Sequence, residues 1–548
     1  MLTFARATRR ELTLIFFAAG GFFLAFPNPL IQLPFAVLFM PASILLLSLE
    51  AKARSRAISC SFLCMFLGSS FALYWLTIPM HNFAGIPWVV GASCVMLLGL
   101  YYGLYGLIFS LLTRFFSRRL SLYPALAASA GSWGALELFR GYFLTGFPWL
   151  SLSSAFAGWP VLAQGGAILG MYGLSALYVL IALLLALLFH TPIASSETMQ
   201  IFTPLLLSRA EKNRKLLLPA LALLTCIIAY GTQRLGTEWD KQGESFLAAM
   251  VQGNTSQMQK WTAENRNYIL KRYLALSRQA LELVKDKYER SADLLLWPET
   301  AMPFAYELSP ESAALIKDFT ASQSTPLLFG AVGVDDKFTG YNRTYNRLIL
   351  LGTDSGAPGH YDKEHLVPFG EYLPPGIHVP FASEFLQGTG FTPGKNLSGL
   401  VLSTTRQLVL GPLICYEVIF PELAQKRVEQ NANLLVSVSN DAWFEFSPAP
   451  LQHLQLAAMR CIEQGRYMLR STNTGISAAI DPAGRILNPS PLFEPWIQVE
   501  SVRVLEEKTI YHDWYFWITG ALWFIPLLLF VVAVIQGFAS SSRKPAKL

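Results

Sequence analysis

The chain has 548 residues, more than one ordinary hydrophobic core organises, so its length predicts two or more structural units. Hydrophobic residues make up 53% of it and charged residues only 14%, whereas a soluble protein has about 25% charged residues, so a purely soluble chain is excluded. The net charge of +6 comes from basic clusters beside apolar segments and therefore argues for membrane topology and against nucleic-acid binding.

Hydropathy predicts about eight membrane-spanning helices, each near the roughly 20 residues that a bilayer requires. Most of them lie in the first 230 or so residues. We therefore expect a membrane domain over residues 1–234 and a last helix with a tail over residues 509–548. The predicted spans lie near residues 11–26, 30–48, 59–78, 88–112, 122–139, 161–189, 216–230 and 514–534.

Basic residues predict the orientation of these helices. They cluster at the N-terminus and at residues 52–56, 114–119, 209–215 and 543–547, whereas the alternate loops 27–29 and 80–86 contain no Lys, Arg, Asp or Glu. Positive charge marks the cytoplasmic side of a membrane protein. Both termini are therefore expected in the cytoplasm, and residues 235–508 on the opposite side.

Residues 235–508 have the pattern of a soluble α/β domain. Short apolar runs bounded by turn residues predict buried strands, and longer amphipathic stretches between them predict helices. Their alternation indicates an α/β core. The predicted strands are 246–251, 294–296, 327–330, 348–351, 408–414 and 434–438, and the predicted helices are 265–288, 309–322 and 452–469.

Glu299, Lys363 and Cys415 are the candidate catalytic residues of this region. Glu299 and Cys415 each follow an apolar strand, so their side chains can meet at one rim of a sheet. A carboxylate can take the thiol proton, and an ammonium can stabilise the oxyanion formed when sulfur attacks a carbonyl. Each residue also has a plain structural interpretation: an inert core cysteine, a turn glutamate and a solvated lysine.

The remaining cysteines and one long loop have less specific interpretations. Cys60, Cys64, Cys94 and Cys226 lie in apolar segments and are expected to be packing residues. Cys461 lies in the same region as Cys415, but a catalytic Cys415 must stay free. The loop 370–393 is expected to expose several apolar residues. Two interpretations have equal support: the loop is a lid that enters the bilayer, or it folds onto its own domain. Its apolar residues are Leu373, Phe381, Phe385, Leu386 and Phe391.

Several longer motifs resemble known families. They are VQGN at 251–254, WPETAMPF at 297–304, KEHLVPFGEYLP at 363–374, CYEVIFPE at 415–422, NDAWF at 440–444, RSTNTGISAAIDPAGRI at 470–486 and, in the apolar region, GFPWLSL at 146–152. The region 235–508 resembles the nitrilase, or carbon–nitrogen hydrolase, superfamily. The chain as a whole resembles the bacterial apolipoprotein N-acyltransferase family over nearly its full length. Glu445 and Cys461 depart from the pattern, because small residues are usual at these two positions.

The resemblance implies a periplasmic αββα sandwich on a bundle of about eight helices in the bacterial inner membrane. It implies that Cys415 takes a fatty acyl chain from a phospholipid as a thioester and passes it to the α-amino group of a diacylglyceryl apolipoprotein. The same resemblance makes Glu299, Lys363 and Cys415 the catalytic triad. No CxxC or His-rich spacing predicts a metal site, and no cofactor is expected. The resemblance also assigns supporting or substrate-binding roles to Glu371, Tyr416, Glu417 and Trp261.

Glu137 and Arg140 are charged residues in an apolar segment, where charges are costly and commonly functional or paired. They are spaced to form an ion pair along a helix, and Arg140 is alternatively a ligand for a lipid phosphate. Two other functions also remain open for the whole chain. One is a membrane-tethered nitrilase-type amidase, and the other is a non-catalytic scaffold that binds or transports lipid.

Overall fold

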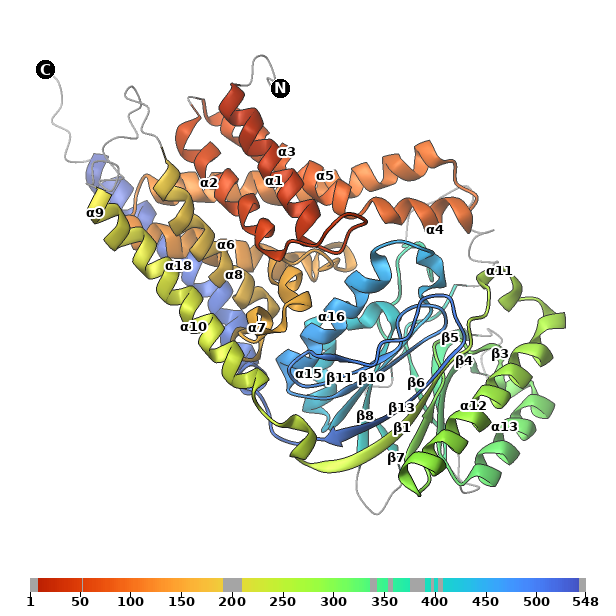
Figure 1. Ribbon diagram of the computed structural model, residues 1–548. Helices are drawn as coiled ribbons and strands as arrows, with labels where there is room; N and C mark the ends of the chain where they lie inside the picture. Colours follow the sequence, from red (N-terminus) through yellow and green to blue (C-terminus); the bar gives the residue numbers. More distant parts are fainter. Residues whose placement is uncertain are drawn as a thin grey trace, which may run out of the picture. The chain divides into compact units, whose positions relative to one another are not determined.

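The computed structural model describes residues 8–51, 53–190, 209–335, 343–352, 358–374, 390–395, 399–402 and 408–541 (Figure 1). The chain forms two compact units. The first, here called the helical unit, contains Met1–Thr77, Trp88–Leu235 and Asp513–Leu548. The second, here called the α/β unit, contains Ile78–Pro87 and Gly236–His512.

The helical unit has a helix within each of the predicted spans. These helices are α1 (Arg9–Ala25), α2 (Phe39–Glu50), α3 (Arg54–Ala72), α5 (Trp88–Ser117), α6 (Leu122–Arg140), α8 (Gly166–Ala186), α10 (Leu218–Leu235) and α18 (Tyr515–Ser541). By length and composition, five helices of the described residues are long and apolar enough to cross a membrane. The predicted region of apolar helices is therefore confirmed, whereas the number of about eight spans stays a prediction.

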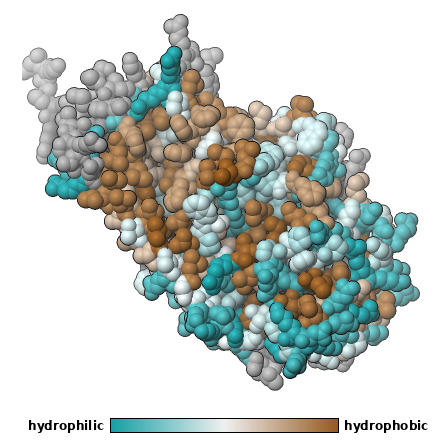
Figure 2. All heavy atoms as spheres, in the orientation of Figure 1, coloured by the Kyte–Doolittle hydropathy of each residue, from teal (hydrophilic) through white to brown (hydrophobic). Residues whose placement is uncertain are grey.

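Small residues allow helices α3 and α5 to approach each other closely. A Cβ atom at Gly99 of α5 would lie 2.1 Å from the Ser70 hydroxyl, and one at Gly106 would lie 2.6 Å from the Ser61 carbonyl of α3. Close backbone contact through small residues is the usual way in which helices associate in a bilayer. Apolar residues also gather on the outer surface of this unit (Figure 2), and α18 exposes Phe516, Trp517 and Phe524.

The α/β unit contains two β-sheets. In the first sheet the strand order is β13-β1-β2-β4-β5-β6, with β3 pairing with β4; in the second it is β12-β11-β10-β9-β8-β7. Strands β1, β2 and β4 are parallel neighbours, as are β8, β9 and β10. The bounds are β1 (Glu244–Gln252), β2 (Leu294–Leu296), β3 (Met302–Ala305), β4 (Leu327–Asp335), β5 (Arg343–Leu351), β6 (Gly359–Asp362), β7 (Leu400–Leu402), β8 (Leu408–Ile414), β9 (Leu434–Ser439), β10 (Met468–Thr472), β11 (Ala478–Ile480), β12 (Ile486–Leu487) and β13 (Trp496–Val504).

Alternating side chains of the strands build two hydrophobic cores. In β1, Leu247 and Ala249 pack with the helices α12 (Arg266–Tyr288) and α13 (Pro310–Gln323), while Phe246 and Ala248 join a core with strands of the second sheet. Successive residues of a strand point to opposite faces, so one strand can serve both cores. With α15 (Pro421–Glu429) and α16 (Ala449–Gln464) on the second sheet (Figure 1), the arrangement is the expected αββα sandwich.

Each predicted strand and helix of the α/β unit overlaps an observed strand or helix, and one predicted helix extends too far. The helix predicted for 452–469 is too long at its end, because Gly465 adopts φ = +63° and terminates α16 after Gln464. Glycine tolerates this left-handed conformation and commonly ends a helix. Met468 and Leu469 belong instead to the buried strand β10. In the sequence, a short apolar stretch such as this one does not distinguish a buried strand from the continuation of a buried helix.

Glu445 has a backbone conformation that favours glycine, with φ = 44° and ψ = −147°. We expect Glu445→Gly to stabilise the protein by about 1 kcal/mol, because a side chain in this region costs about 1–3 kcal/mol and the extra freedom of unfolded glycine offsets part of the gain. Thermal unfolding in detergent measures the effect. Glu445→Ala is the control: it removes the carboxylate but keeps the Cβ atom, so an equal rise in melting temperature for both variants would contradict backbone strain.

Candidate active site

The three candidate catalytic residues follow three different strands of the α/β unit. Glu299 comes after β2, Lys363 directly after β6, and Cys415 directly after β8. Cys415 has φ = +51°, a left-handed conformation at the turn from β8 into the short helix η12 (Cys415–Ile419). A non-glycine residue in this conformation is held there by its surroundings, and such residues cluster at functional sites.

Glu299 is buried and its carboxylate is fixed from two sides. Its Oε1 accepts a hydrogen bond of 2.7 Å from the Asn346 side chain, and its Oε2 accepts one of 2.8 Å from the backbone N–H of Asn440. The Lys363 Nζ lies 3.6 Å from Oε1. These contacts hold a carboxylate in one orientation beside a cation, as a general base requires.

Lys363 is a buried cation between two carboxylates. Its Nζ lies 2.9 Å from Glu371 Oε2 and 3.6 Å from Glu299 Oε1. Burial alone would lower the pKa of Lys363, but the negative charges of Glu371 and Glu299 outweigh burial and raise it above its usual value. The ammonium is therefore charged at every pH at which the protein would work.

The Cys415 thiol is the candidate nucleophile, and its surroundings favour the protonated form. Burial raises the pKa of Cys415 above its usual value, and Glu299 raises it further, while Lys363 acts in the opposite direction. The Ser439 side chain also acts to lower the pKa of the thiol. A thiol in this environment needs a base at the moment of attack, because the thiolate is the reactive form. All cysteines are free, including Cys415 and the fully buried Cys461 of α16.

Glu417 organises the backbone around the site. The side chain is fully buried, and its Oε1 accepts hydrogen bonds from Tyr361 Oη at 2.7 Å and from the backbone N–H of Glu364 at 2.7 Å. Its Oε2 accepts from the backbone N–H of Ile414 at 2.7 Å. One carboxylate thus joins the segment after Lys363 to the residue before Cys415.

The other supporting residues predicted from the sequence differ in whether they contact the candidate catalytic residues directly. Glu371 contacts Lys363 directly and also accepts a 2.8 Å hydrogen bond from the backbone N–H of Val367. The buried Tyr416 ring packs against Phe420, with ring centroids 5.1 Å apart. Trp261 is half-buried at the end of the short helix α11 (Gln257–Lys260). Most of the loop 370–393 lies outside the described residues, including Phe381, Phe385 and Leu386, so both interpretations of this loop stay predictions.

Two buried polar residues at this site carry no sequence signal that singled them out. Asn346 on β5 donates to both Glu299, at 2.7 Å, and Glu371, at 2.9 Å. The Lys260 Nζ donates to the Glu299 carbonyl at 3.2 Å and to the Thr300 hydroxyl at 2.7 Å. Burial lowers the pKa of Lys260 to about 7, although Glu299 opposes this shift.

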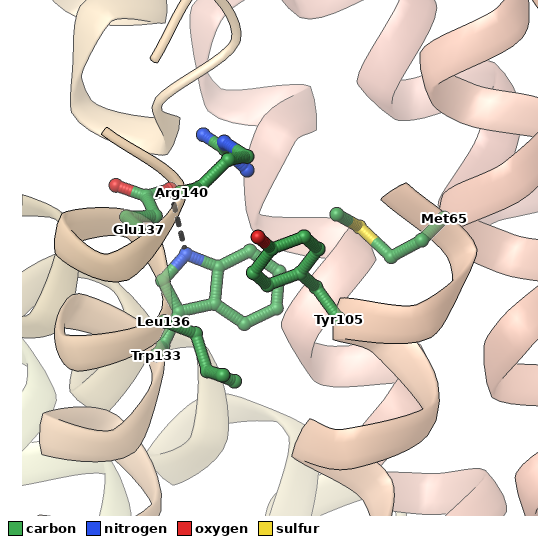
Figure 3. A pocket seen from close by; sticks show the side chains of 6 residues that line it. All are labelled: Met65, Tyr105, Trp133, Leu136, Glu137 and Arg140. Carbon is green, nitrogen blue, oxygen red and sulfur yellow. Dashed lines mark hydrogen bonds between the residues drawn. The ribbon is translucent and has the colours of Figure 1, made fainter. Parts of the chain in front are cut away.

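Arg140 belongs to the helical unit and lines a small pocket with Glu137 and Tyr105 (Figure 3). Its guanidinium lies over the Tyr102 ring, 4.6 Å from the centroid, and donates to the Ser151 hydroxyl at 3.4 Å. Its Nε has no hydrogen-bond partner.

Glu137 has partners of its own. Its Oε1 accepts from Trp133 Nε1 at 2.9 Å and from the backbone N–H of Leu152 at 2.8 Å. Over the described residues, no direct ion pair joins Glu137 to Arg140; each binds the segment around Ser151 separately. Within the same described ranges, no group of three or more His, Cys, Asp or Glu side chains is placed to hold a metal ion.

Comparison with known proteins places these features in a family. A profile for carbon–nitrogen hydrolases matches residues 247–504, and a profile for the N-terminal domain of apolipoprotein N-acyltransferase matches residues 18–184. The apolipoprotein N-acyltransferase of Geobacter metallireducens is 33% identical over 497 residues, covering 89% of this chain and 88% of that protein. That of Azotobacter vinelandii is 34% identical over 456 residues, covering 81% and 80%.

A solved amidase of the nitrilase superfamily from Nesterenkonia is 18% identical and covers 48% of this chain and 93% of its own, with a TM-score of 0.36. The two curated relatives extend over both the helical and the α/β units. The chain therefore belongs to the apolipoprotein N-acyltransferase family.

Proposed function

We propose that this protein transfers a fatty acyl chain from a phospholipid, through a thioester on Cys415, to the N-terminal α-amino group of a diacylglyceryl apolipoprotein. The observation that carries the proposal is the buried pair of Glu299 and Lys363, with charges that act on the partly buried Cys415 thiol, in a chain that also has several apolar helices. Family membership supports the reaction class, since the relatives are named apolipoprotein N-acyltransferases.

The first half-reaction forms the thioester. Glu299 takes the proton of the Cys415 thiol as sulfur bonds to the ester carbonyl carbon of the phospholipid. Lys363 stabilises the negative charge that develops on the carbonyl oxygen. The bond between this carbon and the glycerol oxygen then breaks, and Glu299 returns the proton to that oxygen. A lysophospholipid leaves, and the acyl chain remains on Cys415.

The second half-reaction consumes the thioester. The α-amino group of a peptide has a pKa of about 8, so a useful fraction is neutral near neutral pH. Its nitrogen bonds to the thioester carbon, Lys363 again stabilises the oxyanion, and Glu299 accepts the proton lost by nitrogen. The carbon–sulfur bond breaks, and sulfur recovers a proton from Glu299. The product is the triacylated lipoprotein.

The supporting residues fit roles around this chemistry. Glu371 and Asn346 hold Lys363 and Glu299 in place through the contacts described above. Glu417 fixes the backbone on both sides of the site, and Tyr416 follows the nucleophile directly. Trp261 is half-buried and adjoins Lys260, which contacts Glu299, so we assign it to substrate handling.

We place the protein in the bacterial inner membrane, with residues 235–508 in the periplasm as the catalytic domain and both termini in the cytoplasm. The domain boundaries of this proposal are 1–234, 235–508 and 509–548. Its support is the alternation of basic clusters along the sequence, together with the apolar helices. A phospholipid donor suits this location, because phospholipids form the bilayer.

Arg140 is our candidate ligand for the phosphate of the lipid donor, because its buried guanidinium retains an Nε without a hydrogen-bond partner. We expect Arg140→Gln to raise KM for the phospholipid about 10-fold, the effect of losing one charge-assisted hydrogen bond. KM for the peptide acceptor serves as the internal control and stays unchanged. Unaltered kinetics with phospholipid would dismiss this role and leave Arg140 a structural residue that holds Ser151.

Acyl transfer itself is tested with a phospholipid whose acyl chain is isotopically labelled and a synthetic diacylglyceryl-cysteine peptide. The label is expected on the peptide α-nitrogen, with one lysophospholipid released per acylated peptide. An N-acetylated peptide is the matched control and accepts no label. Label found only as free fatty acid, or rapid hydrolysis of small amides in its place, would favour a membrane-tethered amidase. No covalent transfer at all would favour a lipid-binding scaffold.

A further inference from the structure

A second buried polar network contacts the backbone of Cys415. His453 of α16 places its Nε2 3.0 Å from the Cys415 carbonyl oxygen. Its Nδ1 lies 3.1 Å from Asp441 Oδ1 and 3.1 Å from an Arg470 Nη2 atom. The His453, Asp441 and Arg470 side chains are at most 1% exposed. None of them takes part in the acyl-transfer steps proposed above.

The contacts fix which nitrogen of His453 carries a proton. A carbonyl oxygen only accepts hydrogen bonds, so Nε2 must be protonated and donate to Cys415. Nδ1 either carries a proton and donates a hydrogen bond to Asp441, or presents a lone pair that accepts a hydrogen bond from Arg470. Both arrangements are compatible with a proton on Nε2. The network is itself firmly held, because Arg470 also contacts Asp441 Oδ2 at 3.0 Å and Ser437 at 3.0 Å.

The Cys415 carbonyl matters because it determines the orientation of the next peptide group. The peptide between Cys415 and Tyr416 is planar and trans, so its carbonyl and its N–H point in opposite directions. A hydrogen bond from His453 to the carbonyl therefore also directs the Tyr416 N–H. A backbone N–H immediately after a nucleophile is a common donor to the oxyanion that forms on the attacked carbonyl.

We propose that His453 is a positioning residue for acyl transfer, which holds the Cys415–Tyr416 peptide so that the Tyr416 N–H donates to the oxyanion. The inference rests on the proposed thioester chemistry. Asp441 and Arg470 hold the imidazole so that Nε2 faces Cys415. The left-handed backbone of Cys415, with φ = +51°, makes such an anchor necessary, because an unsupported cysteine would relax to a commoner conformation.

A matched pair of variants tests this role. The amide nitrogen of Gln in His453→Gln reaches nearly as far as Nε2 and can donate to the Cys415 carbonyl. In His453→Asn the amide is one methylene shorter, so it can bind Asp441 or Arg470 but not the carbonyl. We expect the rate constant of acyl-enzyme formation to fall about 100-fold in His453→Asn, the usual effect of losing one oxyanion donor, and by less than about 10-fold in His453→Gln.

Alkylation of Cys415 by iodoacetamide supplies the second measurement. This displacement needs the thiol but forms no oxyanion, so its rate is expected to stay within about 3-fold of the unmodified protein in both variants. Acyl-enzyme formation in His453→Asn at the normal rate would overturn the inference, as would a parallel loss of alkylation and acylation. If the unmodified protein itself forms no acyl-enzyme, the proposed thioester chemistry fails, and the inference fails with it.

Discussion

Replacement of Cys415 by alanine is expected to abolish acyl transfer, lowering the rate by at least about 10⁴-fold, because removal of a covalent nucleophile leaves only binding and electrostatic effects. In the proposed mechanism the thiol carries the acyl chain between donor and acceptor. The measurement is transfer of a labelled acyl chain from phospholipid to the diacylglyceryl peptide, with the variant purified in the same detergent.

Cys461→Ala is the matched control for the loss of a cysteine. Cys461 is fully buried in α16, and over the described residues no hydrogen bond joins its thiol to Glu299, Lys363 or Cys415, so full activity is expected. Retention of transfer by Cys415→Ala would show that the acyl chain never passes through this sulfur. Loss of activity in both variants would point to a general effect of cysteine removal on folding.

Lys363→Met is expected to lower the transfer rate by about 10³-fold, because it removes the cation that stabilises the oxyanion in both half-reactions. The side chain keeps nearly the same length, so the cavity remains filled.

The test of this prediction is the rate of acyl-enzyme formation for Lys363→Met and for Lys241→Met. Lys241 forms an exposed ion pair of 2.6 Å with Glu238, so its replacement is expected to leave the rate unchanged. A normal rate for Lys363→Met would remove the lysine from the chemistry.

The sequence predicted the architecture where its periodicity is unambiguous. The buried strands β1, β2, β4, β8 and β9 appear as short apolar runs, and their parallel pairing follows from the helices between them. The strands β3, β6, β7, β10, β11, β12 and β13 and the helix α15 were not predicted, because most of them are too short to show a period and the others mix polar or charged residues with their apolar ones. The number of membrane spans remains a prediction for a related reason: length and composition of a helix do not place a bilayer.

The candidate site was predictable only in part. Glu299 and Cys415 stand out because a reactive residue type directly follows an apolar strand. Asn346, Lys260 and His453 do not, because their importance depends on hydrogen bonds to residues far away in the sequence. His453, for example, contacts Cys415 only because α16 packs beside η12. Such contacts depend on how the elements of the two-sheet sandwich pack together, and no local pattern encodes them.

Mass spectrometry of the intact protein after incubation with phospholipid tests the central claim most directly. The predicted result is a mass increase of one fatty acyl group, located on Cys415 by peptide mapping, that persists in buffer and disappears when the diacylglyceryl peptide is added. An adduct on another residue, or an adduct on Cys415 that the peptide does not discharge, would contradict a thioester intermediate between lipid donor and lipoprotein acceptor.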